Sequence, residues 1–321
     1  MDVEALLSDA VGGDRRSLSR LLSVVELDDA EFRAIAPAIF AARRGSYSVG
    51  LTGAPGAGKS TLTDALVAEI RRRGERVAVL AVDPSSPITG GAILGDRVRF
   101  RESHALDDDV FVRSLASRGH LGGLSLAVPA ALRTLDAAGW PTVLLETVGV
   151  GQSEVAIADA ADTTLVVVNP GWGDEVQANK AGLLEVADIL VVNKGDRPGA
   201  ESTVRDLERM LHLGADRPWR PPVLTAVAID GSGVDVLWDN IVRHQTFLAE
   251  SGEGERRHAL QRVAEARGRA LADIQQAAVT AEASVGGAEL LDALRRATVD
   301  PVTAGQELLR RAVEAATARL G

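Results

Sequence analysis

Short apolar segments recur between residues 46 and 228, and they alternate with segments of helical periodicity. Several are continuous runs of Val, Ile, Leu and Ala, as expected for strands that are buried on both faces. Strands separated by helices favour a mostly parallel sheet covered by helices on both sides. The predicted strands are Ser46–Thr52, Val77–Val82, Val110–Val112, Thr142–Glu146, Thr163–Val168, Ile189–Val192 and Val223–Ala228.

Helical sequence flanks this α/β region at both ends. Leucines recur at near-helical spacing before residue 45, and Gly45 closes that segment. At Ser251–Gly254 the composition shifts, and beyond it Ala, Arg, Glu and Leu predominate without a strand candidate. We therefore expect an N-terminal helical extension (1–45), an α/β domain (46–250) and a C-terminal helical arm (251–321) that needs a partner surface for its apolar residues.

Composition argues against several functional classes. The net charge of −10 speaks against a nucleic-acid surface, because neutralising phosphates requires clustered Lys and Arg. The absence of Cys excludes disulfides, thiolate metal sites and Cys nucleophiles. The acidic N-terminus has no apolar signal core, and no apolar run reaches the ~20 residues of a spanning helix. We expect a cytoplasmic protein that binds neither nucleic acid nor membrane.

A glycine-rich segment lies between the first predicted strand and a helix. It fits the phosphate-binding P-loop pattern and reads Gly53-Ala54-Pro55-Gly56-Ala57-Gly58-Lys59-Ser60, followed by Thr61. Glycines let backbone N–H groups turn toward an anion, and the following helix adds its positive end. Lys59 would reach the terminal phosphates and the Ser60 hydroxyl would ligate Mg²⁺. A glycine-rich turn that matches by chance is the alternative.

A second motif follows the sixth predicted strand and reads Asn193-Lys194-Gly195-Asp196. A carboxylate at Asp196 can accept hydrogen bonds from the N1–H and the exocyclic amine of guanine, which adenine does not present in that arrangement. A site of this kind rejects the wrong base because its buried carboxylate would be left unpaired. The alternative is a strand-to-loop turn with surface charges. Together with the P-loop, the motif predicts a site for GTP and GDP.

Three acidic residues lie where Mg²⁺ and water would be bound. Asp83 closes the second strand, Asp96 lies in a Gly-rich stretch, and Glu146 ends the fourth strand. Acids at strand ends near a P-loop can bind the metal directly or through water. Gly149 can bring its N–H to the terminal phosphate and move when that phosphate leaves. Each carboxylate alone also fits a helix cap or a solvated loop.

No residue is evident as a catalytic base. In-line attack by water depends mainly on positioning and electrostatics, so such a base is not required. Gln152 is a candidate for orienting the water, and a solvated turn residue is its alternative reading. The candidate catalytic residues are Lys59, Glu146, Gly149 and Gln152.

The motifs together resemble the MeaB, ArgK and MMAA family of P-loop GTPases, which serve adenosylcobalamin-dependent methylmalonyl-CoA mutase. The resemblance covers nearly the whole chain and is carried by Gly53–Thr61, Val82–Asp96, Ser117–Ser125, Glu146–Glu154, Pro170–Asp188, Asn193–Asp196 and Gly231–Trp238. It implies a homodimer built through the C-terminal helices. It also implies Mg²⁺ at Ser60, Asp83, Asp96 and Glu146, and base-side contacts at Thr225, Ala226 and Val227.

The family also has a mobile loop that couples the nucleotide site to the mutase, and Pro170–Lys180 matches its position. Trp172 stands there where the family usually has a small residue. A packed surface aromatic is one reading of Trp172, and an exposed anchor for a protein partner is the other.

The resemblance implies hydrolysis of GTP to GDP and phosphate by a chaperone that gates cofactor loading and protects or reactivates the mutase. A GTPase that delivers nickel is one alternative, but such proteins generally carry His-rich or Cys-containing sites, whereas this chain has five scattered His. A small-molecule kinase of the arginine or ornithine transport type is another, but the sequence has no lid insertion or second anion cluster. A scaffold that binds GTP without turnover is the third.

Overall fold

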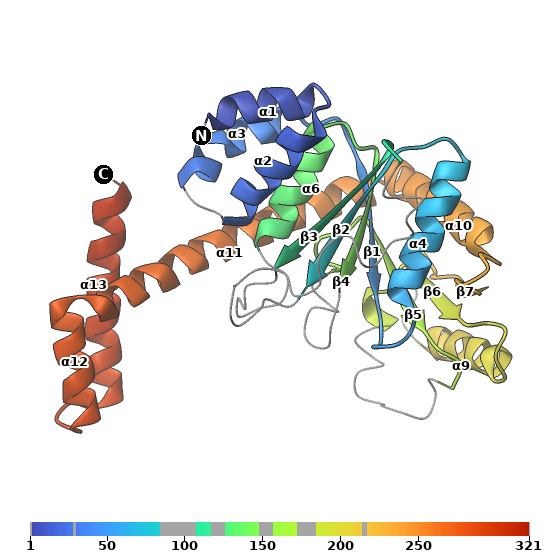
Figure 1. Cartoon of the computed structure of the whole chain (residues 1–321). Coiled ribbons are helices and arrows are strands. Elements are labelled where there is room, and N and C mark those ends of the chain that lie inside the picture. The colour runs from blue at the N-terminus through green and yellow to red at the C-terminus, as the bar shows by residue number, and fades with distance from the viewer. Residues whose placement is uncertain are drawn as a thin grey trace. The chain divides into compact units, whose positions relative to one another are not determined.

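The computed structural model of the chain describes residues 2–27, 30–83, 107–116, 126–147, 157–171, 184–213 and 217–320, and every structural statement below concerns these residues. They contain a seven-stranded parallel sheet in the order β3-β2-β4-β1-β5-β6-β7 (Figure 1). The strands are β1 (Tyr47–Thr52), β2 (Val77–Asp83), β3 (Val110–Ala116), β4 (Thr142–Thr147), β5 (Thr163–Val168), β6 (Ile189–Asn193) and β7 (Val223–Ala226). All seven predicted strands are present.

Two strands differ from the prediction by more than one residue. The edge strand β3 continues to Ala116 although Arg113 interrupts its apolar run, because the guanidinium of Arg113 pairs with Glu26 at 3.2 Å. The other edge strand, β7, ends at Ala226, because Val227 turns away and forms an isolated antiparallel bridge with Ser232. Side-chain partners and turns thus set strand ends that periodicity alone does not specify.

Helices cover both faces of the sheet. Helices α4 (Lys59–Arg72) and α10 (Val234–Ser251) pack on one face, and α6 (Ala127–Ala137) and α9 (Ala200–Leu213) on the other (Figure 1). Successive strand residues therefore enter different cores: Leu165 and Val167 pack on the side of α10, and Val166 lies on the side of α9. Burial on both faces explains why these strands are continuous apolar runs.

The N-terminal helices pack against α6. They are α1 (Val3–Val11), α2 (Arg15–Leu27) and α3 (Ala30–Ala41), and they share one hydrophobic core with α6 and the sheet. Their connection to β1 is held by Asp136, whose Oδ1 accepts the backbone N–H groups of Arg44, Gly45 and Ser46 at 3.0, 2.8 and 2.8 Å.

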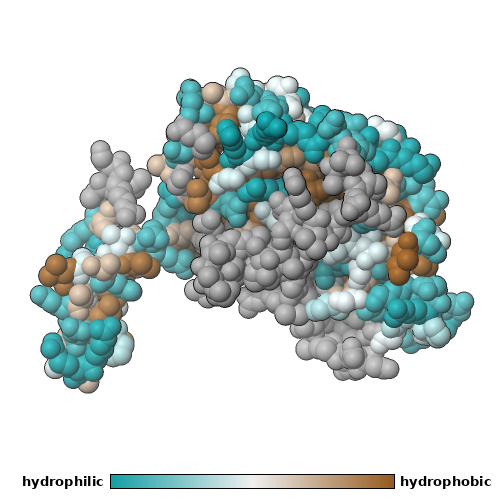
Figure 2. All heavy atoms as spheres, viewed as in Figure 1, coloured by the Kyte–Doolittle hydropathy of each residue, from teal (hydrophilic) through white to brown (hydrophobic). Residues whose placement is uncertain are grey.

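The chain forms two compact units, Met1–His258 and Ala259–Gly321. Helix α11 (Glu253–Ala283) begins in the first unit, and the second also contains α12 (Val285–Arg295) and α13 (Pro301–Leu320). The buried cluster of the second unit is small and consists of Ala277, Ala281 and Ala312. Larger apolar side chains of these helices are exposed (Figure 2), and they are Leu260, Val263, Leu271, Ile274, Val279, Val285, Val302, Leu309 and Val313. Within the described residues, no helix combines the length and apolar character needed to cross a bilayer.

Candidate nucleotide site

The P-loop joins β1, the central strand, to α4. At two of its positions the backbone excludes a side chain. Gly53 has φ 128°, and a Cβ there would lie 2.0 Å from the carbonyl oxygen of Val167 on β5. Gly58 precedes α4 with φ 88°, and a Cβ there would lie 2.4 Å from Nδ2 of Asn193. The loop can therefore approach β5 and β6 this closely only with glycine at both positions.

Two lysines hold the P-loop by its carbonyl oxygens. Lys59 Nζ donates to the carbonyls of Gly53 at 2.7 Å and Ala54 at 3.2 Å, and its side chain is buried. Lys194 Nζ donates to the carbonyl of Gly56 at 2.7 Å. This arrangement fixes the loop from its carbonyl side at the positive end of α4, a geometry suited to an anion.

Asn193 joins the P-loop to the loop after β7. It is the last residue of β6 and is buried, with Nδ2 donating to the carbonyl of Ala57 at 2.8 Å. Its Oδ1 accepts the backbone N–H of Ala228 at 3.1 Å. One amide therefore connects three segments that lie far apart in the sequence, and it places the motif that starts at Asn193 beside the P-loop.

The remaining base-motif residues lie at the same edge of the sheet. Asp196 is exposed. Asn193 pairs with Ala226, and the N–H of Gly195 donates to the carbonyl of Ala226 at 3.0 Å. Thr225 is also exposed, and Val227 is half-buried. The structure thus brings Thr225, Ala226 and Val227 next to the motif that was predicted to select guanine.

Ser60 at the start of α4 and Glu146 near the end of β4 are in contact. Ser60 lies in the first turn of α4, Glu146 lies on β4, and Leu51 of β1 is in register with Glu146. The Ser60 hydroxyl donates a hydrogen bond to Oε1 of Glu146, whose side chain is buried. Two oxygens that were predicted to hold Mg²⁺ are therefore adjacent.

Several predicted site residues lie outside what the structure describes. They are Asp96, Gly149 and Gln152, together with Trp172 in the predicted coupling loop. Asp83 ends β2, whose neighbour β4 carries Glu146, so its backbone reaches the carboxyl edge of the sheet. Among the described residues, no group of three or more His, Cys, Asp or Glu side chains is arranged to hold a metal ion.

Sequence reasoning missed Asn169. This residue directly follows β5, and its Nδ2 lies 3.4 Å from the carbonyl oxygen of Gly56, which also accepts from Lys194. The available signal was its position: a polar residue ends a fully buried strand on the carboxyl side of the sheet, beside the P-loop.

These features define the class of the protein. A P-loop after the central strand, a carboxylate at the end of the adjacent strand and a guanine-type motif after a third strand are the parts of a P-loop nucleotide hydrolase. The chain belongs to the family of the methylmalonyl-CoA mutase-associated GTPase MeaB, whose family model matches residues 18–283. This confirms the family predicted from the motifs, and the protein is a P-loop GTPase.

Individual relatives agree with this assignment. A protein of Pyrococcus abyssi that is named as a GTPase is 43% identical over 97% of each chain. The mitochondrial methylmalonic aciduria type A homolog of Caenorhabditis elegans is 33% identical over 80% of this chain and 69% of its own. A solved structure described as a LAO/AO transport system kinase is 26% identical, covers 95% of this chain and 96% of its own, and superposes with a TM-score of 0.69.

Proposed function

We propose that this GTPase is a nucleotide-dependent chaperone of an adenosylcobalamin-dependent methylmalonyl-CoA mutase. In this role it gates cofactor loading in the cytoplasm and protects or reactivates the mutase. The family description names a mutase-associated GTPase, and the C. elegans relative is named for methylmalonic aciduria. The observation that carries the GTP-dependent part is the contact of Ser60 on the P-loop with Glu146 on β4, because it links the phosphate site to the segment that follows β4.

In this proposal the two motifs divide the nucleotide between them. The P-loop from Gly53 to Thr61 binds the phosphates, and Lys59 exchanges its carbonyl contacts for phosphate oxygens. Asp196 reads guanine, while Asn193 and Lys194 hold the base motif against the P-loop. Thr225, Ala226 and Val227 line the base side, and the pairing of Thr225 and Ala226 with the end of β6 supports this assignment.

Mg²⁺ fits the donor set at the phosphate site. Ser60 and Glu146 offer a hydroxyl and a carboxylate oxygen side by side, and magnesium prefers such hard oxygen ligands. We assign the ion to Ser60 and Glu146, with Asp83 and Asp96 as further ligands. When bound, the ion neutralises charge on the phosphates.

For hydrolysis, we assign Lys59 to stabilise the terminal phosphate. Gly149 would donate its N–H to the same phosphate, and Gln152 would orient the attacking water. Water as the acceptor distinguishes this reaction from that of a small-molecule kinase. Purified protein should release phosphate from GTP without any added acceptor, and release that requires an added amino acid would contradict the proposal.

The exposed apolar residues of α11–α13 support a homodimer formed through the C-terminal helices. Soluble monomers rarely leave many large aliphatic side chains exposed, and the buried cluster of these helices consists of alanines alone. In the dimer, these apolar side chains would pack against the second chain.

The mutase role is tested by binding. Calorimetry with the cognate mutase, apo and cobalamin-loaded, should give affinities that differ between the GDP form and the form with a non-hydrolysable GTP analogue. By linkage, the mutase must then change the relative affinity for the two nucleotides by the same factor. Equal affinities in all states and unchanged turnover would remove the chaperone role and leave the GTPase.

A further inference from the structure

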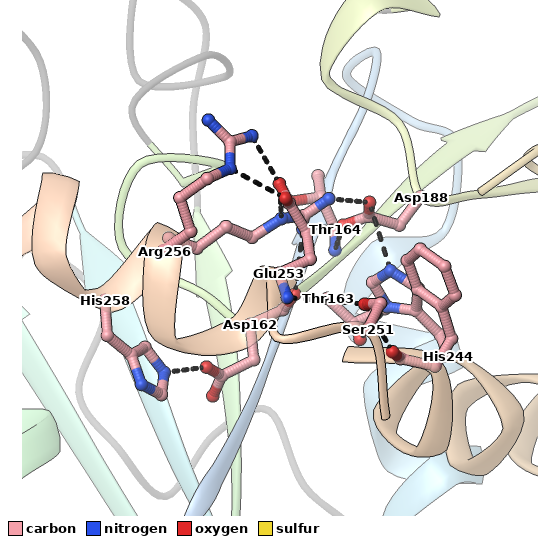
Figure 3. A network of polar contacts seen from close by, with 11 residues as sticks. Asp162, Thr163, Thr164, Asp188, His244, Ser251, Glu253, Arg256 and His258 are labelled. Atoms are coloured by element: carbon pink, nitrogen blue, oxygen red, sulfur yellow. Dashed lines mark hydrogen bonds and ion pairs between the residues drawn. The ribbon is translucent and has the colours of Figure 1, made fainter. Parts of the chain in front are cut away.

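Two buried aspartates lie at the amino ends of strands (Figure 3), whereas the nucleotide site lies at the carboxyl edge of the sheet. Asp162 directly precedes β5 and Asp188 directly precedes β6, and both are less than a tenth exposed. Buried carboxylates require partners, because an uncompensated charge is costly in the interior. Some of these partners, Arg257 and His258, come from the start of α11, far away in the sequence.

Asp188 is held mainly by Arg257. The two terminal guanidinium nitrogens of Arg257 donate to Oδ1 and Oδ2 of Asp188 at 2.9 and 3.1 Å, a bidentate ion pair. Oδ2 also accepts the backbone N–H of Thr164 at 2.9 Å, which fastens Asp188 to β5. Burial by itself would lower the pKa of Arg257, yet the hydrogen bond and charge of Asp188 keep that pKa above its usual value.

Asp162 connects β1, β5 and α11. Its Oδ2 accepts the backbone N–H and the hydroxyl of Ser48 on β1, at 2.7 and 2.6 Å. Its Oδ1 lies 2.5 Å from Nε2 of His258, and its carbonyl accepts from Arg257 at 3.1 Å. The first compact unit ends at His258, so these contacts are the last that α11 makes as part of that unit.

A buried histidine completes the network without adding charge. His244 of α10 is fully buried; its Nδ1 lies 2.7 Å from the Thr163 hydroxyl, and its ring packs on Trp219 with centroids 4.7 Å apart. Burial lowers the pKa of His244 to about 4, so it is neutral near pH 7. At that pH, the positive charge that neutralises the Asp188 carboxylate is therefore supplied by Arg257.

The three strands anchored in this way are the ones that build the nucleotide site at their other ends. β1 leads into the P-loop, β5 into Asn169, and β6 into the guanine motif at Asn193. β6 has five residues and spans roughly 16 Å at the usual rise per residue. Only this short, fully buried strand therefore separates the contacts of Asp188 from the base motif.

We propose that Arg257 is a positioning residue of the nucleotide site: by binding Asp188 and the carbonyl of Asp162, it holds β5 and β6 so that the guanine motif keeps its place. Contacts made by the first turns of α11 would therefore influence the affinity of the nucleotide site. The inference rests on the proposed role of Asn193–Asp196 in binding guanine.

Arg256 provides a matched control. It is adjacent on the same helix, is 66% exposed and pairs with Glu253 rather than with a buried carboxylate. The experiment uses the full-length protein and measures the rate at which fluorescent GDP is released. It also measures the affinities for GDP and for IDP, which lacks the exocyclic amine, and kcat and KM for GTP. Arg257→Ala should release GDP about threefold to tenfold faster, discriminate less against IDP and raise KM with little change in kcat. Arg256→Ala should match the wild type.

If Arg257→Ala fails to fold, the charge-neutral pair Asp188→Asn with Arg257→Gln replaces it, since it leaves an oxygen to accept from Thr164. The same increase in GDP release is expected from it. A variant that melts at a lower temperature but keeps wild-type release and wild-type GDP/IDP discrimination would overturn the inference. A wild-type protein without preference for GDP over IDP would instead contradict the proposed guanine site, so the two failures are distinguishable.

Discussion

The two compact units of this chain differ in how they bury apolar side chains. In the first unit, strands are covered on both faces by helices, and Leu51, Val167 and Leu190 are fully buried. In the second unit the helices meet through alanines, and larger residues such as Leu271 and Ile274 are about half exposed or more. The first unit thus contains what a stable core and a site require, whereas the second leaves larger apolar side chains exposed.

The largest expected effect is the loss of nucleotide binding in the first unit, with the oligomeric state of the protein unchanged. Lys59→Ala removes the ammonium that contacts Gly53 and Ala54, and with it the charge meant for the phosphates. GTP and GDP binding should fall by at least about 100-fold and turnover should disappear, because a charge-assisted contact of this kind contributes about 3 kcal/mol or more.

Calorimetry measures the binding of the Lys59→Ala variant, and light scattering measures its oligomeric state. Unchanged GTP affinity would remove the P-loop assignment. A changed oligomeric state would show that nucleotide binding by the first unit and self-association through the second are coupled.

Base choice is the second test of the first unit. Asp196→Asn replaces an acceptor with a donor, so the variant should prefer XTP, whose C2 carbonyl accepts a hydrogen bond, over GTP. The relative affinity should shift on the order of 100-fold, because a site built for hydrogen bonding discriminates strongly. A competition assay with both nucleotides measures the shift, and an unchanged preference would exclude Asp196 from the site.

The buried network at the amino ends of the strands makes the first unit sensitive to acid. Burial lowers the pKa of His244 to about 4 from 6.5, so the unfolded chain binds more protons than the folded one between these values. The contribution of His244 to the free energy of unfolding is therefore fully present above pH 6.5. It decreases by roughly 2–3 kcal/mol as the pH falls toward 4.

Urea unfolding at pH 7 and pH 5 measures this loss, with His244→Gln as the comparison. The variant should lose less stability than the wild type between the two pH values. Equal losses in both proteins would show that His244 does not titrate in this way.

The smallest expected effect concerns self-association through the helices of the second unit. Leu271→Glu together with Ile274→Glu places charge on exposed apolar positions of α11, and the proposed dimer should weaken about tenfold, or roughly 1–2 kcal/mol. Arg267→Glu, at an exposed polar position of the same helix, is the control for added negative charge. Sedimentation would measure the dissociation constant of the dimer. GTP turnover should be unchanged. A wild-type full-length protein that is already monomeric would refute the homodimer.

Much of the fold was predictable because its strands are local apolar runs. All seven were identified, and the errors larger than one residue lie at the two edge strands, where Arg113 pairs with Glu26 and Val227 turns toward Ser232. The residues of the nucleotide motifs were predictable for a related reason, since each motif is contiguous and follows a strand. Asn169 was missed because a single polar residue after a strand carries no pattern.

By itself, the sequence determined the elements, the P-loop between β1 and α4, and the residue types that phosphate and guanine require, because these depend on spacing along one stretch of chain. Only the tertiary structure decided that Ser60 meets Glu146, that the amide of Asn193 reaches Ala57, and that Arg257 neutralises Asp188. These partners lie far apart in the sequence, and the order of the strands in the sheet brings them together. Strand order results from how the helices pack on both faces, and periodicity within one segment contains no information about it.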